Sequence, residues 1–239
     1  MICTRRVGRE ISRASESTER FLARLPQFAD LENSEVRRIA ACATDVFVPV
    51  GAVLFRPGEA CGGLHFVVEG LIKLAVQNSR GEEKVIDLVG PGGSFGETAL
   101  FLGRPHGIVA EALADSRLLQ LGKEVVLGEV MRNAGFSRRL LKSVCHRLDQ
   151  RTRDLESVTL HSGTQRVTAY LLGQLPEEVN GAPVAIRLPA KKGIIASRLN
   201  LTHEHFSRIL HEVQAAGLIE VRGREIRILD VGRLRSYPG

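Results

Sequence analysis

Five glycines recur along the middle of the chain and divide it into brief runs of β-branched and apolar residues. Gly51, Gly58, Gly70, Gly81 and Gly92 are separated by 7, 12, 11 and 11 residues. Glycine adopts the left-handed backbone of tight turns without steric cost, so this spacing indicates turns between short strands. The pattern is typical of a sandwich, a barrel or a jelly roll. The sequence therefore predicts a β-roll from about residue 46 to residue 121, with strands such as LHFVVEG buried on both faces.

Beyond Gly122 the periodicity changes to that of one long helix. No proline or glycine occurs between Phe136 and His161, and one narrow apolar stripe follows the helical period. Such a helix is about twice the mean length, and a narrow stripe suits pairing with another helix. We therefore expect a dimer seam, although the same stripe is also compatible with packing on the chain's own β-roll. The expected dimerisation residues are Leu140, Val144, Leu148 and Leu155, with Arg151 on the same stripe.

The charge distribution indicates where an anionic partner would bind. The 239 residues suit one large or two small domains, and the 44% hydrophobic and 25% charged residues exclude disordered and fibrous classes. The formal net charge is +6. Residues 186–235 hold ten basic and five acidic side chains, so +5 of that +6 lies in this short segment. A concentrated positive charge is the electrostatic footprint expected of nucleic-acid binding.

This basic segment contains a helix, a tight turn and a second helix, in the stretch AKKGIIASRLNLTHEHFSRILHEVQAAGLIE. Thr202 is a favourable N-cap for the second helix, and Gly217 suits its C-terminus. One face of that helix is apolar, and a polar face carries Glu204, Ser207, Arg208 and His211 at positions i, i+3, i+4 and i+7. The hairpin LIEV-RGR-EIRIL follows as a candidate wing.

The polar face has side chains suited to base edges in the DNA major groove. Arginine bonds guanine through two donors, glutamate accepts from the cytosine amine, and serine donates or accepts. Phosphate contacts supply affinity without sequence information. We expect base reading by His203, Glu204, Ser207 and Arg208, and phosphate contacts by Lys191, Lys192, Arg198, Thr202, Arg222 and Arg224.

Together with the long helix, the motifs FGETALF (residues 95–101) and EHFSR (residues 204–208) make the chain from about Leu25 resemble the CRP/FNR superfamily of regulators. The resemblance implies an α+β fold with a cyclic-nucleotide-binding-type β-roll, a dimerisation helix and a C-terminal winged helix-turn-helix. It further implies a homodimer that reads TTGAT-type palindromes in double-stranded DNA, with RNA polymerase as a partner. The expected domains are an N-terminal arm (1–24), an effector-sensing β-roll (25–121), the connecting and dimerisation helix (122–161) and the DNA-binding domain (162–239).

The expected effector pocket lies around GPGGSFGE and consists of Gly96, Glu97, Thr98 and Arg104. In members that bind cyclic AMP, this loop and its glutamate hold the nucleotide, and an Arg-Ser pair about ten residues later binds the cyclic phosphate. Gly107 and Ile108 occupy those places here. Cyclic AMP is therefore not expected, and a cyclic-nucleotide-dependent regulator remains the alternative because Arg104 lies nearby.

The motifs LHSGTQRVTAYLL, HFSRILH and GREIRILD are similar to the Dnr-like branch, whose members respond to nitric oxide and are linked to haem. No metal site is assigned, but the candidate haem ligands are His65, His106, His146 and His161, with Cys61 and Met131 as weaker candidates. The iron–sulfur cluster of the founding FNR protein needs closely spaced N-terminal cysteines. Only Cys3 lies near that end, so no such cluster is expected.

Other classes fit the sequence less well. The four cysteines show no zinc-knuckle or disulfide spacing, no segment has the pattern of a secretory signal, and no apolar run nears the ~18 residues of a membrane span. We therefore expect a cytoplasmic protein without membrane association. A cupin-type enzyme would need clustered histidines and carboxylates, whereas His65 and His106 stand alone, so no enzymatic activity is expected. A non-specific nucleic-acid-binding module would show a steep salt dependence without preference for a palindrome.

Overall fold

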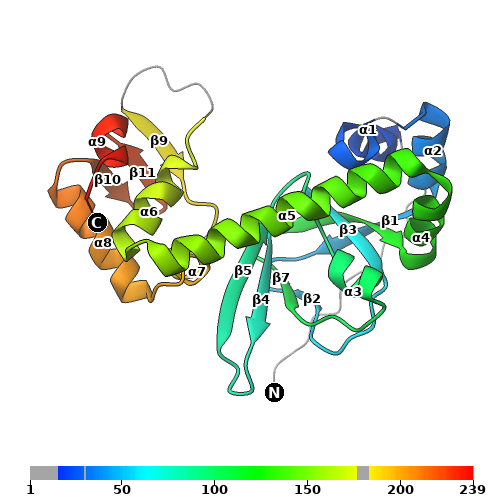
Figure 1. Ribbon diagram of the computed structural model, residues 1–239, viewed down its shortest axis with the longest axis horizontal. Helices are drawn as coiled ribbons and strands as arrows, with labels where there is room; N and C mark the ends of the chain where they lie inside the picture. The colour runs from blue at the N-terminus through cyan, green and yellow to red at the C-terminus, as the bar shows by residue number, and fades with distance from the viewer. Residues whose placement is uncertain (1–15, 30, 177–182, 239) are drawn as a thin grey trace. The chain divides into compact units, whose positions relative to one another are not determined.

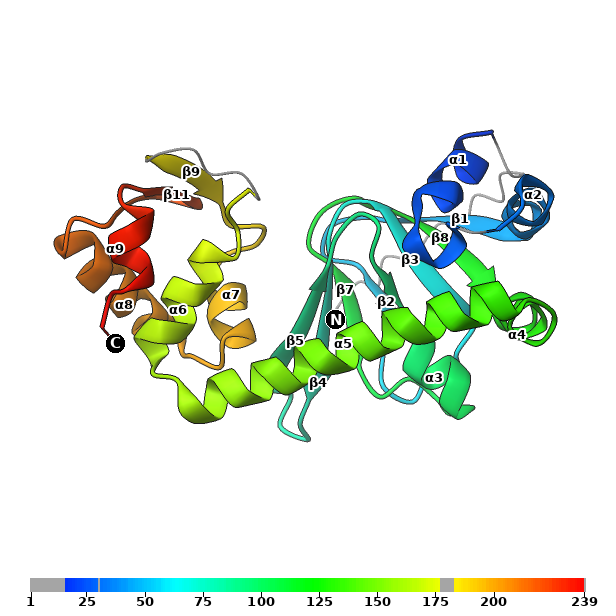
Figure 2. The same cartoon turned by 45° about the horizontal axis from the view of Figure 1, so that its top comes forward.

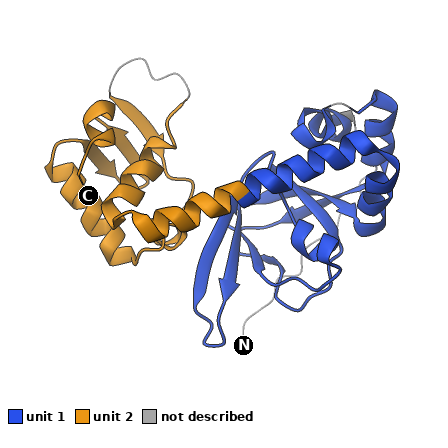
Figure 3. Cartoon of the chain, viewed as in Figure 1, with its two compact units in different colours: residues 1–148 blue, residues 149–239 orange. Residues whose placement is uncertain are grey.

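The structure is a computed structural model that describes residues 16–29, 31–176 and 183–238. The chain divides into two compact units, Met1–Leu148 and Asp149–Gly239, which are coloured separately in Figure 3. The division falls within one long helix, α5 (Ala134–Leu160). Its 27 residues confirm the helix that the sequence predicts.

Unit 1 is built around a β-roll of two four-stranded antiparallel sheets (Figure 1). One sheet has the order β1 (Ala43–Val48), β8 (Ser116–Gly122), β3 (Gly63–Glu69) and β6 (Ser94–Phe95). The other has the order β2 (Val53–Phe55), β7 (Val109–Ala112), β4 (Ile72–Gln77) and β5 (Glu83–Val89). The predicted roll is confirmed, and most of β3 and β4 is buried, as expected for strands covered on both faces.

The glycines that predicted the roll do lie at its turns. All five have positive φ angles, between 78° and 95°. Gly70 shows most clearly why no other residue fits. A β-carbon there would lie 2.2 Å from Ser116 Oγ and 2.6 Å from Ser116 Cα, because β3 turns into β4 directly against the start of β8.

Helices close one side of the roll and share its core. They are α1 (Glu16–Arg24), the 3-10 helix η1 (Pro26–Phe28), α2 (Asn33–Ala41), α3 (Glu97–Leu102), α4 (Lys123–Arg132) and the first half of α5. The ring of Phe28 lies 5.5 Å from that of Phe66 on β3 and 5.5 Å from that of Phe136 on α5. The core is therefore formed jointly by the roll and the helices that flank it in sequence.

Two sequence expectations are corrected in this core. Residues 16–24 were expected to belong to a partly helical arm, and they do form the helix α1, but its Leu22 is fully buried in the core. Residues 1–15, including Cys3, lie outside the described residues. Leu140 was expected in the dimer seam, but it is only 3% exposed and packs in the core with Phe136. The physical reason is the same in both cases. The apolar faces of α1 and early α5 are covered by the chain's own roll, as Figures 1 and 2 show for α5.

Unit 2 contains the predicted helices and hairpin. Its helices are α6 (Gly163–Leu172), α7 (Lys192–Arg198), α8 (His203–Ala215) and the unpredicted α9 (Val231–Arg235). Its antiparallel sheet has the order β10 (Ile219–Arg222), β11 (Glu225–Ile228) and β9 (Val184–Arg187). Ser162 begins α6 with a reciprocal capping box to Gln165. Within the described part of the chain, no helix is long and apolar enough to cross a membrane.

Candidate nucleic-acid interface

Helix α8 is fixed in orientation by its apolar side. Phe206, Ile209, Leu210 and Val213 are buried in the core of unit 2. At its N-terminus, the Thr202 hydroxyl accepts a hydrogen bond from the His205 N–H at 3.2 Å. The opposite face is therefore held toward solvent. It carries exposed His203, Glu204, Arg208 and His211 and half-buried Ser207.

Glu204 is prepared to accept hydrogen bonds. The pKa of the Glu204 carboxyl is lowered mainly by the hydrogen bond from its own backbone N–H and further by the hydrogen bond from the Thr202 hydroxyl. The side chain is therefore a carboxylate at neutral pH, the form that accepts from a cytosine amine.

Two close approaches bring the neighbouring helices onto α8. The turn between α7 and α8 passes through Asn200 at φ 58°, a left-handed conformation that asparagine tolerates better than most residues. At Gly163, the start of α6, an added β-carbon would lie 3.1 Å from His205 Cε1 and 3.2 Å from Ile209 Cδ1. The missing side chain at Gly163 lets α6 pack closely against α8, and the left-handed turn at Asn200 joins α7 to α8.

A groove of about 500 Å³ runs beside the exposed face of α8. It is lined by Ser207 and Arg208 of the expected base-reading set and by Lys192 of the expected phosphate set. His211 and Gln214 extend the same wall. The sequence prediction did not include Gln214. This residue lies three positions after His211 and so belongs to the same polar face of the helix. Its Oε1 also accepts the Val221 N–H at 3.1 Å, which connects α8 to the wing strand β10.

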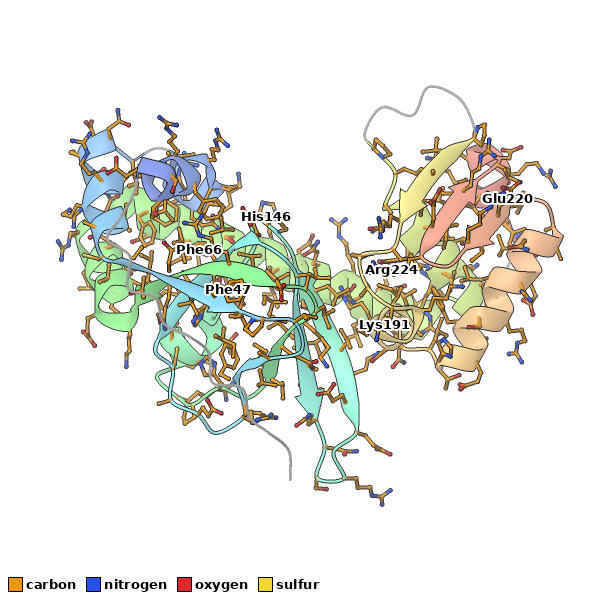
Figure 4. All side chains as sticks on the ribbon, turned by 180° about the vertical axis from the view of Figure 1, so that it is seen from behind. Phe47, Phe66, His146, Lys191, Glu220 and Arg224 are labelled. Carbon is orange, nitrogen blue, oxygen red and sulfur yellow. The ribbon has the colours of Figure 1, made fainter. Side chains whose placement is uncertain are left out.

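The wing is a two-residue hairpin between β10 and β11. Arg222 pairs with Glu225 across the strands, and Gly223 takes a φ of 63° at the turn. Arg222 and Arg224 are both exposed there. Lys191 is exposed just before α7, and Figure 4 labels it in unit 2 together with Arg224. These three cations remain accessible to an anionic partner.

Arg198 is placed differently from the expectation. Its Nη2 lies 2.9 Å from Asp154 Oδ2 on the part of α5 that belongs to unit 2, and Arg151 Nη1 lies 2.9 Å from the same oxygen. Nearby, burial raises the pKa of the Tyr170 phenol to about 12, and the charge of Arg198 partly opposes this rise. Arg198 therefore joins α7 to α5, and its guanidinium is already engaged by a carboxylate.

Comparison with known proteins agrees with both units. Residues 45–133 match the family described as the cyclic nucleotide-binding domain, and residues 165–237 match the Crp-like helix-turn-helix domain. The chain belongs to the CRP/FNR family of regulators. DNA binding through the helix-turn-helix is common to CRP-like regulators, which are typically dimeric.

Individual relatives cover nearly the whole chain at low identity. The CRP-like cAMP-activated global transcriptional regulator of Mycobacterium tuberculosis is 23% identical over 219 residues, which is 90% of this chain and 97% of that protein. The structure of FixK2 from Bradyrhizobium japonicum has a TM-score of 0.72 at 21% identity, over 82% of this chain and 98% of that one. DNR from Pseudomonas aeruginosa has a TM-score of 0.51 at 28% identity, over 94% and 99%. These relatives support the family and fold, and membership of the Dnr-like branch stays a prediction.

The loop that binds nucleotide in some CRP/FNR members is occupied internally here. Glu97 is 7% exposed, and its Oε1 accepts from Ser94 Oγ at 2.6 Å and lies 2.6 Å from Arg147 Nη2. Arg147 also donates to the Ser94 carbonyl at 2.6 Å. Gly96 precedes α3 at φ 107°, whereas Thr98 and Arg104 are exposed. The carboxylate of the expected pocket is therefore already neutralised by a guanidinium from α5.

Two of the four expected haem ligands share a cavity, and that cavity is small. His65 and His106 are buried and line one cavity of about 250 Å³, below the ~300–1,000 Å³ usual for drug-sized ligands. His146, labelled in Figure 4, and His161 are exposed and do not line it. A cavity of this volume does not fit haem.

Proposed function

We propose that this CRP/FNR regulator binds as a homodimer to a TTGAT-type palindrome and reads each half-site with the N-terminal half of α8. The observation that carries the proposal is the two-sidedness of α8. Its apolar side is buried, which leaves Glu204, Ser207 and Arg208 on the accessible side. In helix-turn-helix proteins, the N-terminal part of this second helix meets the base edges.

The chemistry of the three side chains suits that half-site. Arg208 can donate two hydrogen bonds to the single guanine of TTGAT, and the Glu204 carboxylate can accept from the amine of the cytosine that pairs with this guanine on the opposite strand. Ser207 can donate or accept between them. His203 completes the proposed reading set. The proposed phosphate contacts are Lys191, Lys192, Thr202, Arg222 and Arg224, and Arg198 is left out because of its ion pair with Asp154.

A binding experiment separates base reading from phosphate contact. Fluorescence anisotropy would be measured with the palindrome and with a scrambled duplex at several salt concentrations. We expect Arg208→Ala to weaken binding to the palindrome by about 1 to 3 kcal/mol per half-site and to leave the scrambled duplex nearly unaffected. Lys191→Ala is the matched control and should weaken both duplexes alike, with a salt slope lower by about 1 for each protomer. Equal losses on both duplexes for Arg208→Ala would refute the base-reading role.

The homodimer is proposed to form through those apolar residues of the α5 stripe that are exposed in the single chain. Leu148 and Leu155 are 66% and 68% exposed in the single chain, and Val144 is also accessible. Exposed leucines at this spacing match a two-helix seam. Pairing there would present two copies of α8 to half-sites about 34–36 Å apart.

The dimer is tested by Leu148→Asp, with the off-stripe, exposed Gln150→Asp as control. Sedimentation velocity should show monomers only for Leu148→Asp, and this variant should also lose the palindrome. A Leu148→Asp protein that remains dimeric and binds DNA would rule out the seam.

Nitric-oxide sensing through haem, implied by the resemblance to the Dnr-like branch, receives no support from the described histidines. We expect an absorption titration with hemin to show no saturable Soret shift. A stoichiometric shift that disappears in a His65→Ala or His106→Ala variant would overturn this expectation. Control of DNA binding by the β-roll remains part of the proposal, with an effector other than haem.

A further inference from the structure

The cavity that His65 and His106 share in the β-roll is lined in part by polar side chains. Its wall includes Phe55, Glu59, Gly62, His65, His106 and Gln120. A β-carbon at Gly62 would lie 2.9 Å from Gln120 Nε2, so a glycine here leaves room for the Gln120 amide. The backbone of His106 donates to the Glu59 carbonyl at 2.9 Å and accepts from the Gly58 N–H at 2.8 Å. These bonds hold the loop that carries His106 against the loop that carries Glu59.

Both imidazoles are held rigidly by aromatic packing. The His106 ring stacks on Phe55, with centroids 3.6 Å apart and planes 8° from parallel. The His65 ring stacks on Phe95, at 5.1 Å and 12°. Each imidazole is at most 5% exposed, so neither can turn away to bulk solvent. Fixed polar groups in a small cavity are the usual means of orienting a small ligand.

The electrostatics of the wall define the class of ligand. Burial lowers the pKa of His106, an effect that the Glu59 carboxylate only partly opposes, so the imidazole is neutral at pH 7 and keeps a nitrogen that accepts a hydrogen bond. The wall contains Glu59 but no lysine or arginine. An anion would find no counter-charge there, whereas a molecule with N–H donors would find acceptors.

We propose that this cavity binds a small molecule that is cationic or neutral and donates N–H hydrogen bonds, and that this molecule is an effector of the protein. Its volume of about 250 Å³ limits the ligand to a size below that of a nucleotide. The site differs from the loop at Gly96–Thr98, whose carboxylate is held by Arg147.

The position of His65 supplies a route from the cavity to α5. His65 pairs with Phe95 in the β3–β6 ladder and also stacks on its ring. The residues that follow and precede Phe95 attach α5 to the roll through Arg147. The Ser94 carbonyl accepts from Arg147, and Gly96 is followed by Glu97, which forms an ion pair with Arg147. A ligand that shifts His65 would therefore act on β6 and on the attachment of α5. This regulatory step rests on the proposed function, whereas ligand binding in the cavity does not.

Binding is tested on the full chain with 4-aminopyridine, a planar cation with N–H donors, and with benzoate as an anion of similar size. The readout is the NMR signal of each histidine Cε1–H, of which the chain has seven. We expect 4-aminopyridine to shift the His65 and His106 signals saturably, with an affinity on the order of 1 mM, and benzoate to leave them unchanged.

Two variants check the assignment of the site. His106→Phe retains a ring to stack on Phe55 but removes both nitrogens, and it should weaken 4-aminopyridine at least about tenfold, roughly the value of one lost hydrogen bond to a charged group. The exposed His146→Ala is the control and should bind as the parent does. No saturable shift, an equal shift with benzoate, or equal shifts of all seven signals would each overturn the site.

A separate measurement tests the coupling. Saturating 4-aminopyridine should change the affinity for the palindrome several-fold, and Arg147→Gln should abolish this change while the histidine signals still respond. If the ligand binds without altering DNA affinity, the effector role is wrong. If the parent protein ignores the palindrome altogether, the proposed function fails, and the histidine signals still decide whether the cavity is a site.

Discussion

The ion-pair cluster at Asp154 provides a quantitative test of how unit 2 is held together. The perturbation is Asp154→Asn, which preserves size and removes the charge. Asp154 Oδ2 lies 2.9 Å from the nearest nitrogen of both Arg151 and Arg198. The variant therefore loses two attractions at once and leaves two guanidinium nitrogens within about 6 Å of each other, where like charges repel.

The magnitude follows from exposure. The three side chains are 22–38% exposed, so solvent screens each pair, and an ion pair of this kind contributes about 0.2 to 1 kcal/mol. Loss of two pairs together with the new repulsion should lower the free energy of unfolding of unit 2 by about 1 to 2 kcal/mol. Since exposed pairs are screened by salt, the effect should shrink markedly in about 1 M NaCl, where the Debye length is ~3 Å.

The chain contains its own reporter for this assay. It has no tryptophan, and its two tyrosines, Tyr170 and Tyr237, both belong to unit 2. Tyrosine fluorescence during urea unfolding therefore follows unit 2 alone. A double-mutant cycle with Asp154→Asn and Arg198→Met should give a coupling of about 0.5 to 1 kcal/mol at low salt. A coupling under about 0.3 kcal/mol, or one insensitive to salt, would refute a stabilising ion pair between Arg198 and Asp154 and would return Arg198 to the phosphate-contacting set.

Three further predictions concern the stability of unit 1, which is measured by following urea unfolding with circular dichroism. Burial lowers the pKa of His106 below 6.5, so its contribution to stability is complete above about pH 6.5 and is lost as the pH falls; His106→Phe should flatten that dependence. Phe136→Ala removes a buried ring and should cost about 3 to 5 kcal/mol, whereas the exposed Leu141→Ala should stay within about 0.5 kcal/mol. Gly70→Ala would press a methyl group into Ser116 and should destabilise the roll by more than about 1 kcal/mol. An unchanged urea midpoint for Phe136→Ala or for Gly70→Ala would contradict the packing described.

The features that the sequence predicted best are those fixed by local conformation. A turn that needs positive φ favours glycine wherever it occurs, so Gly51 and Gly81 mark strand ends without any knowledge of the partners. The N-cap at Thr202 is equally local, and the structure confirms it. The strands β6 and β7, with two and four residues, are too short for the sequence to establish a period.

The residues that the sequence misplaced are those whose neighbour comes from elsewhere in the chain. A helical stripe identifies a buried face but not what buries it, so Leu140 and Leu148 look alike in sequence. In the structure, the early turns of α5 are covered by the roll, and the later ones are not. Likewise, Arg198 was indistinguishable from Lys192 as a basic residue on α7 until Asp154 was found opposite it.

The same distinction explains why the proposed base-reading residues follow from the sequence more directly than the proposed effector cavity. The proposed base-reading residues lie on the accessible side of α8, so helical period and charge suffice to locate them. An effector site is enclosed by several segments, and the residues around the cavity come from loops and strands between Val46 and Gln120. His65 and His106 each looked isolated in the sequence, and only the folding of β3 and of the loop before β7 places them on one wall. The proposed effector cavity therefore depends on tertiary structure, whereas the proposed base-reading residues all lie on one helix.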